Sequence, residues 1–337
     1  MLDERKTAIL SAVVQEYITT AQPVGSSHIA RASGVGVSSA TVRNEMAVLE
    51  QEGYLIQPHT SAGRIPTDKG YRFFVDHLAA PRRIDAATSR QVGDFFEAAH
   101  GRLEEMLHQT SDLLTKLTRN AAVVLGPKAE AATIRSAQIV RLSPNAATVV
   151  LVLGNGNVEN EVIAIDDDTS DAVLAAASVH LARTLTGETL GSLGSLGSSG
   201  IAIGTGDERT DAICAAAIDA MQLVSTDAHV FVGGASNLAD SFDAVDVVRQ
   251  VLHTLEQQFV VVSLVRDIVD RGMSVAIGVE HGVEPLSACS VVVAPIVVDG
   301  EHIGSVGVLG PTRMNYPQAL ATVDIVSNRL GRRLGET

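Results

Sequence analysis

The stretch Ser38-Ser-Ala-Thr-Val-Arg-Asn-Glu-Met-Ala-Val-Leu-Glu-Gln-Glu-Gly53 decides how the amino-terminal part of the chain folds. Its apolar side chains Val42, Met46 and Leu49 recur with the spacing of one helix face. Ser38 is a favourable N-cap and Gly53 a favourable terminator, so the stretch predicts one amphipathic helix. The opposite face carries small or hydrogen-bonding side chains, which need no burial and can lie against the edges of DNA bases.

A β-hairpin is predicted directly after this helix. Residues 54–57 read as a short strand, Gly63-Arg64 as the turn at the tip, and Ile65-Pro66 as the return strand. Thr67 then caps a further helix. Upstream, residues 3–19 predict a helix with one broad apolar face, and a shorter helix follows it. Helices followed by a hairpin tipped with an arginine outline a winged helix-turn-helix domain.

Eight residues of this region are candidate DNA contacts. They are Ser38, Ser39, Thr41, Arg43, Asn44, His59, Arg64 and Lys69. Arginine can bind guanine through two hydrogen bonds, asparagine can bind adenine in the same way, and hydroxyl groups reach bases or phosphates. Arg43 and Asn44 lie in the second turn, within the part of a recognition helix that enters the major groove. In a second interpretation, Thr41 and Asn44 form hydrogen bonds within the helix itself.

The hairpin supplies the remaining candidates. Arg64, with His59 and Lys69 nearby, fits a hairpin that reaches a minor groove or phosphates. Gly63 permits the tight turn and a close approach of the backbone. The sequence also fits an alternative for each of two residues. Arg64 would be a solvated turn residue, and His59 would hold the hairpin together by hydrogen bonds instead of touching DNA.

Several sequence motifs resemble those of the HrcA family of heat-inducible transcription repressors. In the amino-terminal region they are Gln22-Pro-Val-Gly-Ser26, Ala40-Thr-Val-Arg-Asn-Glu-Met46 and Pro58-His-Thr-Ser-Ala-Gly-Arg-Ile-Pro-Thr67. Further along they are Phe231-Val-Gly-Gly-Ala-Ser-Asn237, Gly278-Val-Glu280 and Gly310-Pro-Thr-Arg-Met-Asn-Tyr316. The resemblance spans the chain and is weakest between Asp166 and Ala228, where a Gly-Ser repeat and an alanine-rich helix look peculiar to this protein.

The resemblance implies an α+β multidomain protein. Its winged helix-turn-helix domain would occupy residues 1–80, and its body would be a GAF-like α/β domain that carries an inserted dimerisation domain. We expect a linker and long connecting helix at 81–120, the first part of the GAF-like domain at 121–165, the insertion at 166–244 and the second part at 245–337.

The body of the chain carries its own local signals. Two hairpins are predicted, one pairing residues 149–153 with 158–165 and the other pairing 290–298 with 302–309 across Asp299-Gly300. Helical patterns cover Thr169–Leu185, Glu208–Leu223 and Asp246–Asp270. The repeat Leu190-Gly-Ser-Leu-Gly-Ser-Leu-Gly-Ser-Ser-Gly200 resembles a flexible surface linker, because no lysine or helix start follows it as in a phosphate-binding loop.

A heptad-like apolar stripe runs from Val92 to Leu117. At about 1.5 Å per residue it predicts roughly 39 Å of continuous helix. One interpretation is a dimeric coiled coil, and the other is a connecting helix that lies along the next domain. Gly93 and Gly101 inside the stripe favour the connecting helix.

Charge and composition limit the class of protein. The 337 residues carry a net charge of −14, but the segment up to Arg90 is nearly balanced, with ten Lys and Arg against nine Asp and Glu. The acidic excess therefore lies downstream and repels DNA, which leaves the amino-terminal domain as the expected contact surface. Cys214 and Cys289 lie in apolar runs typical of buried, reduced thiols, with a redox role as the alternative. No signal peptide or membrane span is indicated, so a cytoplasmic protein is expected.

The resemblance also implies a function. It predicts a repressor of heat-shock (chaperone) operons that binds double-stranded DNA at an inverted-repeat CIRCE-type operator as a homodimer, depends on the chaperonin GroEL and loses activity on heat stress. The alternative is a small-molecule-responsive winged-helix regulator with an effector pocket in the GAF-like domain. An enzyme is not expected, because no nucleophile motif, metal-ligand spacing or Walker-type loop is present, and no cofactor or metal is expected.

Overall fold

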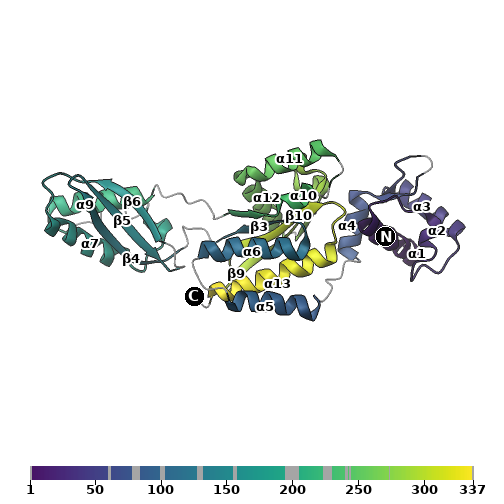
Figure 1. Cartoon of the computed structure of the whole chain (residues 1–337), viewed down its shortest axis with the longest axis horizontal. Helices are drawn as coiled ribbons and strands as arrows, with labels where there is room; N and C mark the ends of the chain where they lie inside the picture. Colours follow the sequence, from purple (N-terminus) through teal and green to yellow (C-terminus); the bar gives the residue numbers. More distant parts are fainter. Residues whose placement is uncertain are drawn as a thin grey trace.

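The computed structural model arranges the chain in three parts along one long axis (Figure 1). A group of helices with a small hairpin lies at one end, a five-stranded sheet covered by helices lies in the centre, and a three-stranded sheet lies at the other end. The chain is therefore a mixed α+β multidomain protein, as predicted. The structure describes residues 2–59, 62–77, 84–98, 103–126, 132–154, 158–193, 205–222, 230–239, 242, 244–272 and 274–335.

The amino-terminal part follows the predicted order of elements. These are α1 (Glu4–Thr20), α2 (Ser26–Ile29), α3 (Ser39–Gln51), β1 (Leu55–Ile56), β2 (Ile65–Pro66) and α4 (Asp68–His77). The cap of α3 is confirmed, since the Ser38 Oγ accepts a hydrogen bond from the Thr41 amide at 3.2 Å. Val42, Met46 and Leu49 are fully buried, which confirms the predicted apolar face.

The central sheet is antiparallel throughout, with the strand order β7-β3-β10-β9-β8. Its strands are β3 (Ala121–Leu125), β7 (Val230–Gly233), β8 (Val275–Ile277), β9 (Cys289–Val298) and β10 (Glu301–Pro311). Strands β9 and β10 form the predicted hairpin, and both Asp299 and Gly300 have positive φ angles, 51° and 85°. These angles suit the tight turns that join twisted antiparallel strands.

Helices cover both faces of this sheet (Figure 1). One face packs against α5 (Ala86–Ala98), α6 (Leu103–Thr118) and α13 (Tyr316–Gly335). The other packs against α10 (Ala235–Ala239), α11 (Val245–Glu256) and α12 (Gln258–Asp270). Successive residues of β3 and β9 alternate between the two resulting apolar cores, as the two-residue period of a strand requires.

The predicted long connecting helix is wrong. Helices α5 and α6 lie on opposite sides of α13, so the stripe from Val92 to Leu117 is divided between two helices and forms neither a coiled coil nor one 39 Å rod. Val92, Leu107 and Leu114 are fully buried because both helices pack on the same central layer. The periodicity identified the apolar faces correctly, but it carries no information on where the helix ends. The helical pattern at 246–270 is divided in the same way, between α11 and α12.

An inserted unit interrupts the central sheet between β3 and β7, which are direct neighbours in it. The unit contains β4 (Ile134–Ser143), β5 (Ala146–Leu153), β6 (Val158–Ala164), α7 (Asp171–Leu185), a short 3-10 turn, η2 (Leu190–Ser192), and α9 (Glu208–Gln222). Its strands form a separate three-stranded sheet whose core does not merge with the central one.

Two predictions for this region need correction. The resemblance places residues 121–165 in the first part of the GAF-like domain, whereas the strands from Ile134 to Ala164 pack against α7 and α9 inside the insertion. A hairpin signal shows that two strands pair but not which sheet they join. The start of the predicted Gly-Ser linker is also wrong, since Leu190 and Leu193 are buried in the insertion's core. Residues 194–204 lie outside the described residues.

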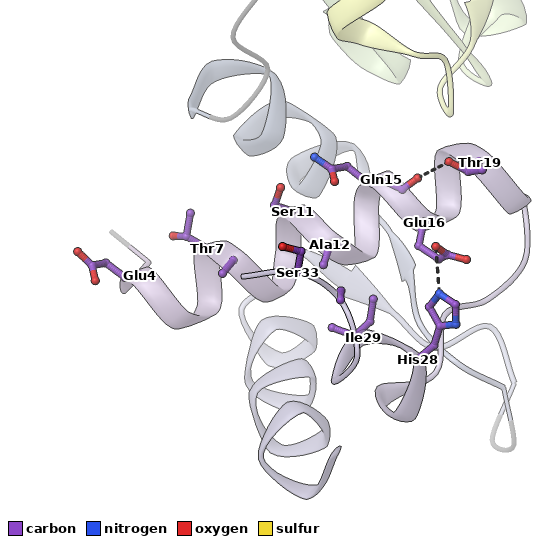
Figure 2. A pocket seen from close by; sticks show the side chains of 12 residues that line it. Glu4, Thr7, Ser11, Ala12, Gln15, Glu16, Thr19, His28, Ile29 and Ser33 are labelled. Carbon is purple, nitrogen blue, oxygen red and sulfur yellow. Dashed lines mark hydrogen bonds and ion pairs between the residues drawn. The ribbon is translucent and has the colours of Figure 1, made fainter. Parts of the chain in front are cut away.

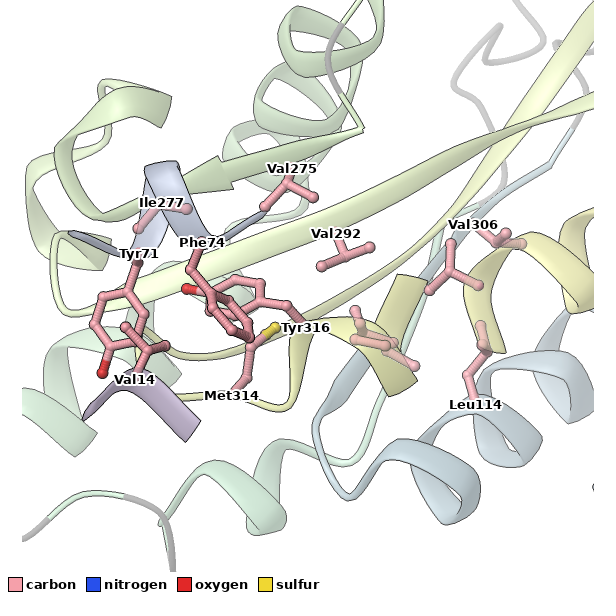
Figure 3. Packing of buried hydrophobic residues seen from close by; sticks show 14 of the residues in the cluster. Val14, Tyr71, Phe74, Leu114, Val275, Ile277, Val292, Val306, Met314 and Tyr316 are labelled. Atoms are coloured by element: carbon pink, nitrogen blue, oxygen red, sulfur yellow. The ribbon is translucent and has the colours of Figure 1, made fainter. Parts of the chain in front are cut away.

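Helix α4 joins the amino-terminal part to the central sheet. Tyr71 and Phe74 are buried in an apolar core that continues without interruption from α1 to β9 and α13. Figure 3 shows both rings beside Met314 and Tyr316, and the Tyr71 and Tyr316 ring centroids are 5.9 Å apart.

A partly buried ion pair completes this joint. The Arg72 Nε donates to Glu280 Oε1 at 2.9 Å, its Nη2 donates to Glu280 Oε2, and Nη2 also donates to the Val275 carbonyl at 2.9 Å. Glu280 lies in the 3-10 turn η3 (Gly278–His281) beyond β8. Gly278 is required there, because a Cβ atom on it would lie 2.2 Å from Asp68 Oδ2 and its φ is +55°.

The carboxylate of Glu280 is strongly held by its partners. Burial alone would raise its pKa, but hydrogen bonds from Arg72 and from the Ile277 amide outweigh that effect, so the pKa lies below its ordinary value of 4.5. A folded-state pKa below the unfolded value stabilises the fold at neutral pH, and this contribution is lost as the pH falls through the folded-state value.

We therefore expect Glu280→Gln to lower the free energy of unfolding at pH 7 by about 1 to 2 kcal/mol, because Arg72 keeps a neutral partner in place of a charged one. The difference from the wild type should be constant near neutral pH and shrink below pH 4.5. Urea unfolding followed by circular dichroism measures it, with the exposed Glu284→Gln as the matched control. Equal stability of the two variants at pH 7 would contradict the assigned role of the pair.

Candidate nucleic-acid interface

The start of α3 presents a group of hydroxyl side chains. The Ser38 and Thr41 hydroxyl oxygens are 3.0 Å apart. The Ser39 Oγ lies 3.3 Å from the Ser26 Oγ and 3.2 Å from the Ser27 Oγ, so it links α3 to the start of α2. These contacts fix the angle between the two helices and favour the interpretation in which Thr41 serves the helix itself.

Arg43 and Asn44 extend from α3 into solvent. Both side chains are exposed, and within the described part of the chain neither forms a hydrogen bond or an ion pair. An exposed guanidinium and an exposed carboxamide on adjacent positions of one helix are free to bind a partner of complementary shape. The sequence predicted this exposure from the absence of any apolar body on that face.

The prediction for Arg64 is wrong in its geometry. Arg64 does not lie at the tip of the hairpin but directly before β2, where its backbone amide and carbonyl both bond to Val24 at 2.9 Å. Its Nε and Nη2 both contact Glu50 Oε2 at 2.9 Å, and only 16% of its side chain is exposed. It is therefore neither a free contact nor a solvated turn residue, because an acid in the last turn of α3 holds it.

Lys69 and His59 lie in different surroundings. The Lys69 Nζ donates to the Glu52 carbonyl at 2.8 Å and lies 4.4 Å from the centre of the Tyr54 ring. It thus satisfies a carbonyl at the carboxyl end of α3, where a cation also interacts favourably with the helix dipole. His59 is exposed on the hairpin, and its carbonyl accepts a hydrogen bond from the Ala62 amide at 2.9 Å.

The structure therefore separates the eight predicted residues into two groups. Ser38, Ser39, Thr41, Arg43 and Asn44 gather at the amino end of α3. Arg64 and Lys69 brace the other end of the same helix, and His59 lies on the hairpin beyond it.

Most cations of the amino-terminal part are paired. Arg5 lies 3.6 Å from Glu45, and Lys6 lies 3.6 Å from Asp3. Arg64, Lys69 and Arg72 have the partners given above. Of the Lys and Arg residues among positions 2–59 and 62–77, only Arg31 and Arg43 lack an acidic or carbonyl partner for their side chains.

Arg31 is a candidate that the sequence analysis missed. It is exposed in the connection between α2 and α3. A cation in that connection is well placed for a phosphate contact, since helix-turn-helix modules hold the DNA backbone from the ends of their helices. Arg31 differs from most other cations of this part only in lacking a partner among the described residues. The sequence does not show which cations are paired with acids, so it could not single out Arg31.

A groove in the amino-terminal part has the wrong charge for DNA. A groove of about 700 Å³ lies between α1 and α2, as Figure 2 shows, and its polar lining includes Glu4, Ser11, Glu16 and His28. The His28 Nε2 lies 3.1 Å from Glu16 Oε2. No lysine or arginine is among the residues that line the groove. Carboxylates on this face repel phosphates, so the face of α3 with Arg43 is the better candidate.

Other kinds of site find little support in the described residues. They contain no cluster of three or more His, Cys, Asp or Glu side chains that could hold a metal ion. None of their helices has the length and apolar character needed to cross a membrane. Both cysteines are free and buried, as predicted, and burial raises the pKa of Cys214 to about 11 and that of Cys289 to about 12, so both thiols stay protonated at neutral pH.

Comparison with known proteins assigns the family. The HrcA protein C-terminal domain model matches residues 104–320. The chain belongs to the HrcA family. One relative is the heat-inducible transcription repressor HrcA of Pseudarthrobacter chlorophenolicus, 38% identical over 99% of this chain and 100% of the relative. The protein of the same name from Nocardioides sp. is 37% identical, with all of both chains covered.

A solved structure shares the whole fold. It is described only as a hypothetical protein, solved at 2.2 Å resolution, and it is 25% identical to this chain. The match covers 100% of this chain and 99% of the other, with a TM-score of 0.67. The family assignment and the three-part architecture therefore extend over the full length.

Proposed function

We propose that this chain is a sequence-specific DNA-binding repressor of heat-shock (chaperone) operons. Its amino-terminal part would act as a winged helix-turn-helix domain on a GAF-like body, with α3 as the recognition helix and the β1–β2 hairpin as the wing. It would repress by occupying a CIRCE-type inverted repeat, not by catalysis. The names of the relatives support the repressor role.

The observation that carries the proposal is the exposed, unpartnered pair Arg43 and Asn44 on the first half of α3. A recognition helix contacts base edges with the residues near its amino end, and these two side chain types match guanine and adenine. The hydroxyls of Ser38 and Ser39 lie at the start of the same helix, and the exposed Arg31 lies in the connection before it, so all three suit phosphate contacts. In this arrangement Arg64 and Lys69 support α3 and do not touch DNA, whereas His59 stays a candidate wing contact.

We expect Arg43→Ala to weaken binding to the cognate operator by about 1 to 3 kcal/mol, because it removes a base contact. Binding to a scrambled duplex should change much less. Footprinting on the protein's own chaperone promoters locates the operator, and fluorescence anisotropy then gives both affinities, with Arg249→Ala on α11 as the control. An equal loss on both duplexes would exclude base readout by Arg43.

A homodimer is the second part of the proposal, and the outer face of the three-stranded sheet is its proposed interface. Alternate residues of β5 pack onto α7 and α9, which leaves the other face of the sheet uncovered. On that face Val140, Val158 and Val162 are exposed, and Val162 is exposed by 59%. The register adds Gln138, Thr148, Val150, Val152 and Asn160, and none of these eight positions carries a charged side chain.

The occupant that fits this face is a second copy of the chain. Two chains of net charge −14 repel each other, and they can approach closely only through surfaces without charge. An apolar sheet face is also self-complementary about a twofold axis, which is the symmetry of most homodimers and of an inverted-repeat operator.

We expect Val162→Asp to convert the dimer into a monomer, because two carboxylates would be buried against each other at the interface. Analytical ultracentrifugation measures the change. Val179→Asp is the matched control, since Val179 is 61% exposed on α7 and lies away from the face. A Val162→Asp variant that still sediments as a dimer would place the interface elsewhere.

Dependence on the chaperonin GroEL is the third part of the proposal. Of the eleven aromatic residues, seven lie at or before Phe96, so the large body is packed mainly with Val, Ala, Ile and Leu. Aromatic side chains bury roughly 150 to 250 Å² each, so their scarcity limits the stability of the body. A repressor of low stability loses its fold first when heat diverts the chaperonin to other clients.

We expect operator binding to decay after a temperature rise and to recover when GroEL and ATP are added. Anisotropy measurements on the operator duplex, with and without chaperonin, follow both steps. A chain that stays active well above growth temperature without chaperonin, but releases the operator when a metabolite is added, would instead be a small-molecule-responsive regulator.

A further inference from the structure

Arg64 and Glu50 join three segments of the amino-terminal part. The Arg64 backbone pairs with Val24, which follows α1, and its side chain crosses to Glu50 in the last turn of α3. Gly63 lets the hairpin come this close, because a Cβ atom on it would lie 2.4 Å from the Val24 carbonyl oxygen. The hairpin is therefore held at Arg64, through the backbone on one side and through the side chain on the other.

Glu50 occupies a sensitive place on α3. It lies seven residues after Arg43, which is almost two full turns, so both side chains leave the helix on the same face about 10 Å apart. That face is the one that the proposed function turns toward DNA. A carboxylate there without a partner would lie within about one Debye length of the phosphates and repel them.

The contacts of Arg64 neutralise the Glu50 carboxylate on the proposed DNA-binding face of α3. Its Nε and Nη2 both lie 2.9 Å from Glu50 Oε2, and the side chain is 16% exposed while that of Glu50 is 33% exposed. An arginine committed in this way has little surface left for a phosphate, and moving it to DNA would expose the acid that it neutralises. Direct contact and neutralisation of Glu50 are therefore competing uses of one guanidinium.

We propose that Arg64 and Glu50 form a positioning pair that fixes the wing against the recognition helix and neutralises Glu50, and that Arg64 makes no contact with DNA. This inference rests on the proposed function, since it assigns a role within the same DNA-binding surface. The pair acts through Arg43 and its neighbours by keeping the angle between α3 and the hairpin constant and the α3 face free of negative charge.

A charge exchange tests the pair in the full-length chain. Arg64→Glu places two carboxylates together and should lower affinity for a CIRCE duplex by at least about tenfold. Adding Glu50→Arg restores an opposite-charge pair in the same place, and the double variant should recover to within about threefold of the wild type, as coupling between contacting residues predicts. If Arg64 contacts DNA directly, the double variant should stay as weak as Arg64→Glu.

The salt dependence of binding gives a second measurement that folding alone does not change. The double variant Arg64→Met with Glu50→Gln should leave the slope of log affinity against log salt at its wild-type value, because it removes no phosphate contact and leaves no unpaired carboxylate. Arg31→Met is the matched control and should reduce the slope by about 0.9, the value for one phosphate contact. A reduction of that size for the variant with both Arg64→Met and Glu50→Gln would overturn the proposal, and this holds even if both charge-exchange variants fail to fold.

Two controls separate the possible failures. Thermal unfolding followed by circular dichroism sets a temperature at which every compared variant is folded. A wild-type chain that binds the CIRCE duplex no better than a scrambled duplex would refute the proposed function itself. If the wild-type chain prefers the operator but the charge-exchange double variant still binds it weakly, only the role of Arg64 and Glu50 would be refuted.

Discussion

The burial of Tyr71 and Phe74 against the central sheet holds the amino-terminal helices to the rest of the molecule. Both residues are at least 98% buried, and they lie in one apolar core with side chains of α1, β9 and α13. Arg72 adds an ion pair across the same joint, to an acid 208 positions away in the chain. Helix α4 therefore belongs to two parts of the molecule, and α3 has a defined position relative to the body.

The fixed position of α3 relative to the body matters for the proposed dimer, because the molecule is long. The proposed dimer face lies at one end of the molecule and α3 at the other, with the central sheet between them (Figure 1). Two recognition helices can select a fixed half-site spacing only if the connection between dimer face and α3 is rigid. The continuous apolar core supplies that rigidity at the joint between α4 and the central sheet, and loosening this joint changes the spacing before it changes any base contact.

Local features of the fold were predictable from the sequence, whereas long-range pairings were not. Ser38 caps α3, Gly53 follows that helix at φ +79°, and Asp299-Gly300 turns a hairpin, because each depends on a few neighbouring residues. The break between α5 and α6 and the sheet to which β4, β5 and β6 belong depend on packing partners far along the chain. The exposure of Arg43 was predictable from the pattern of its own helix, but the pairing of Arg64 with Glu50 required the fold.

The pairing of Arg64 with Glu50 belongs to a wider pattern of paired cations in the amino-terminal part of this acidic chain. Five of the seven cations among positions 2–59 and 62–77 are engaged by acids or carbonyls, and Arg31 and Arg43 are the two that are not. Few free cations release few counterions, so non-specific attraction to the DNA backbone is weak. With α3 as the proposed recognition helix, affinity would then depend on the correct bases lying opposite it. Internal pairing of cations therefore favours specificity over general affinity, and a negatively charged body strengthens this preference because it repels DNA that lies outside the interface.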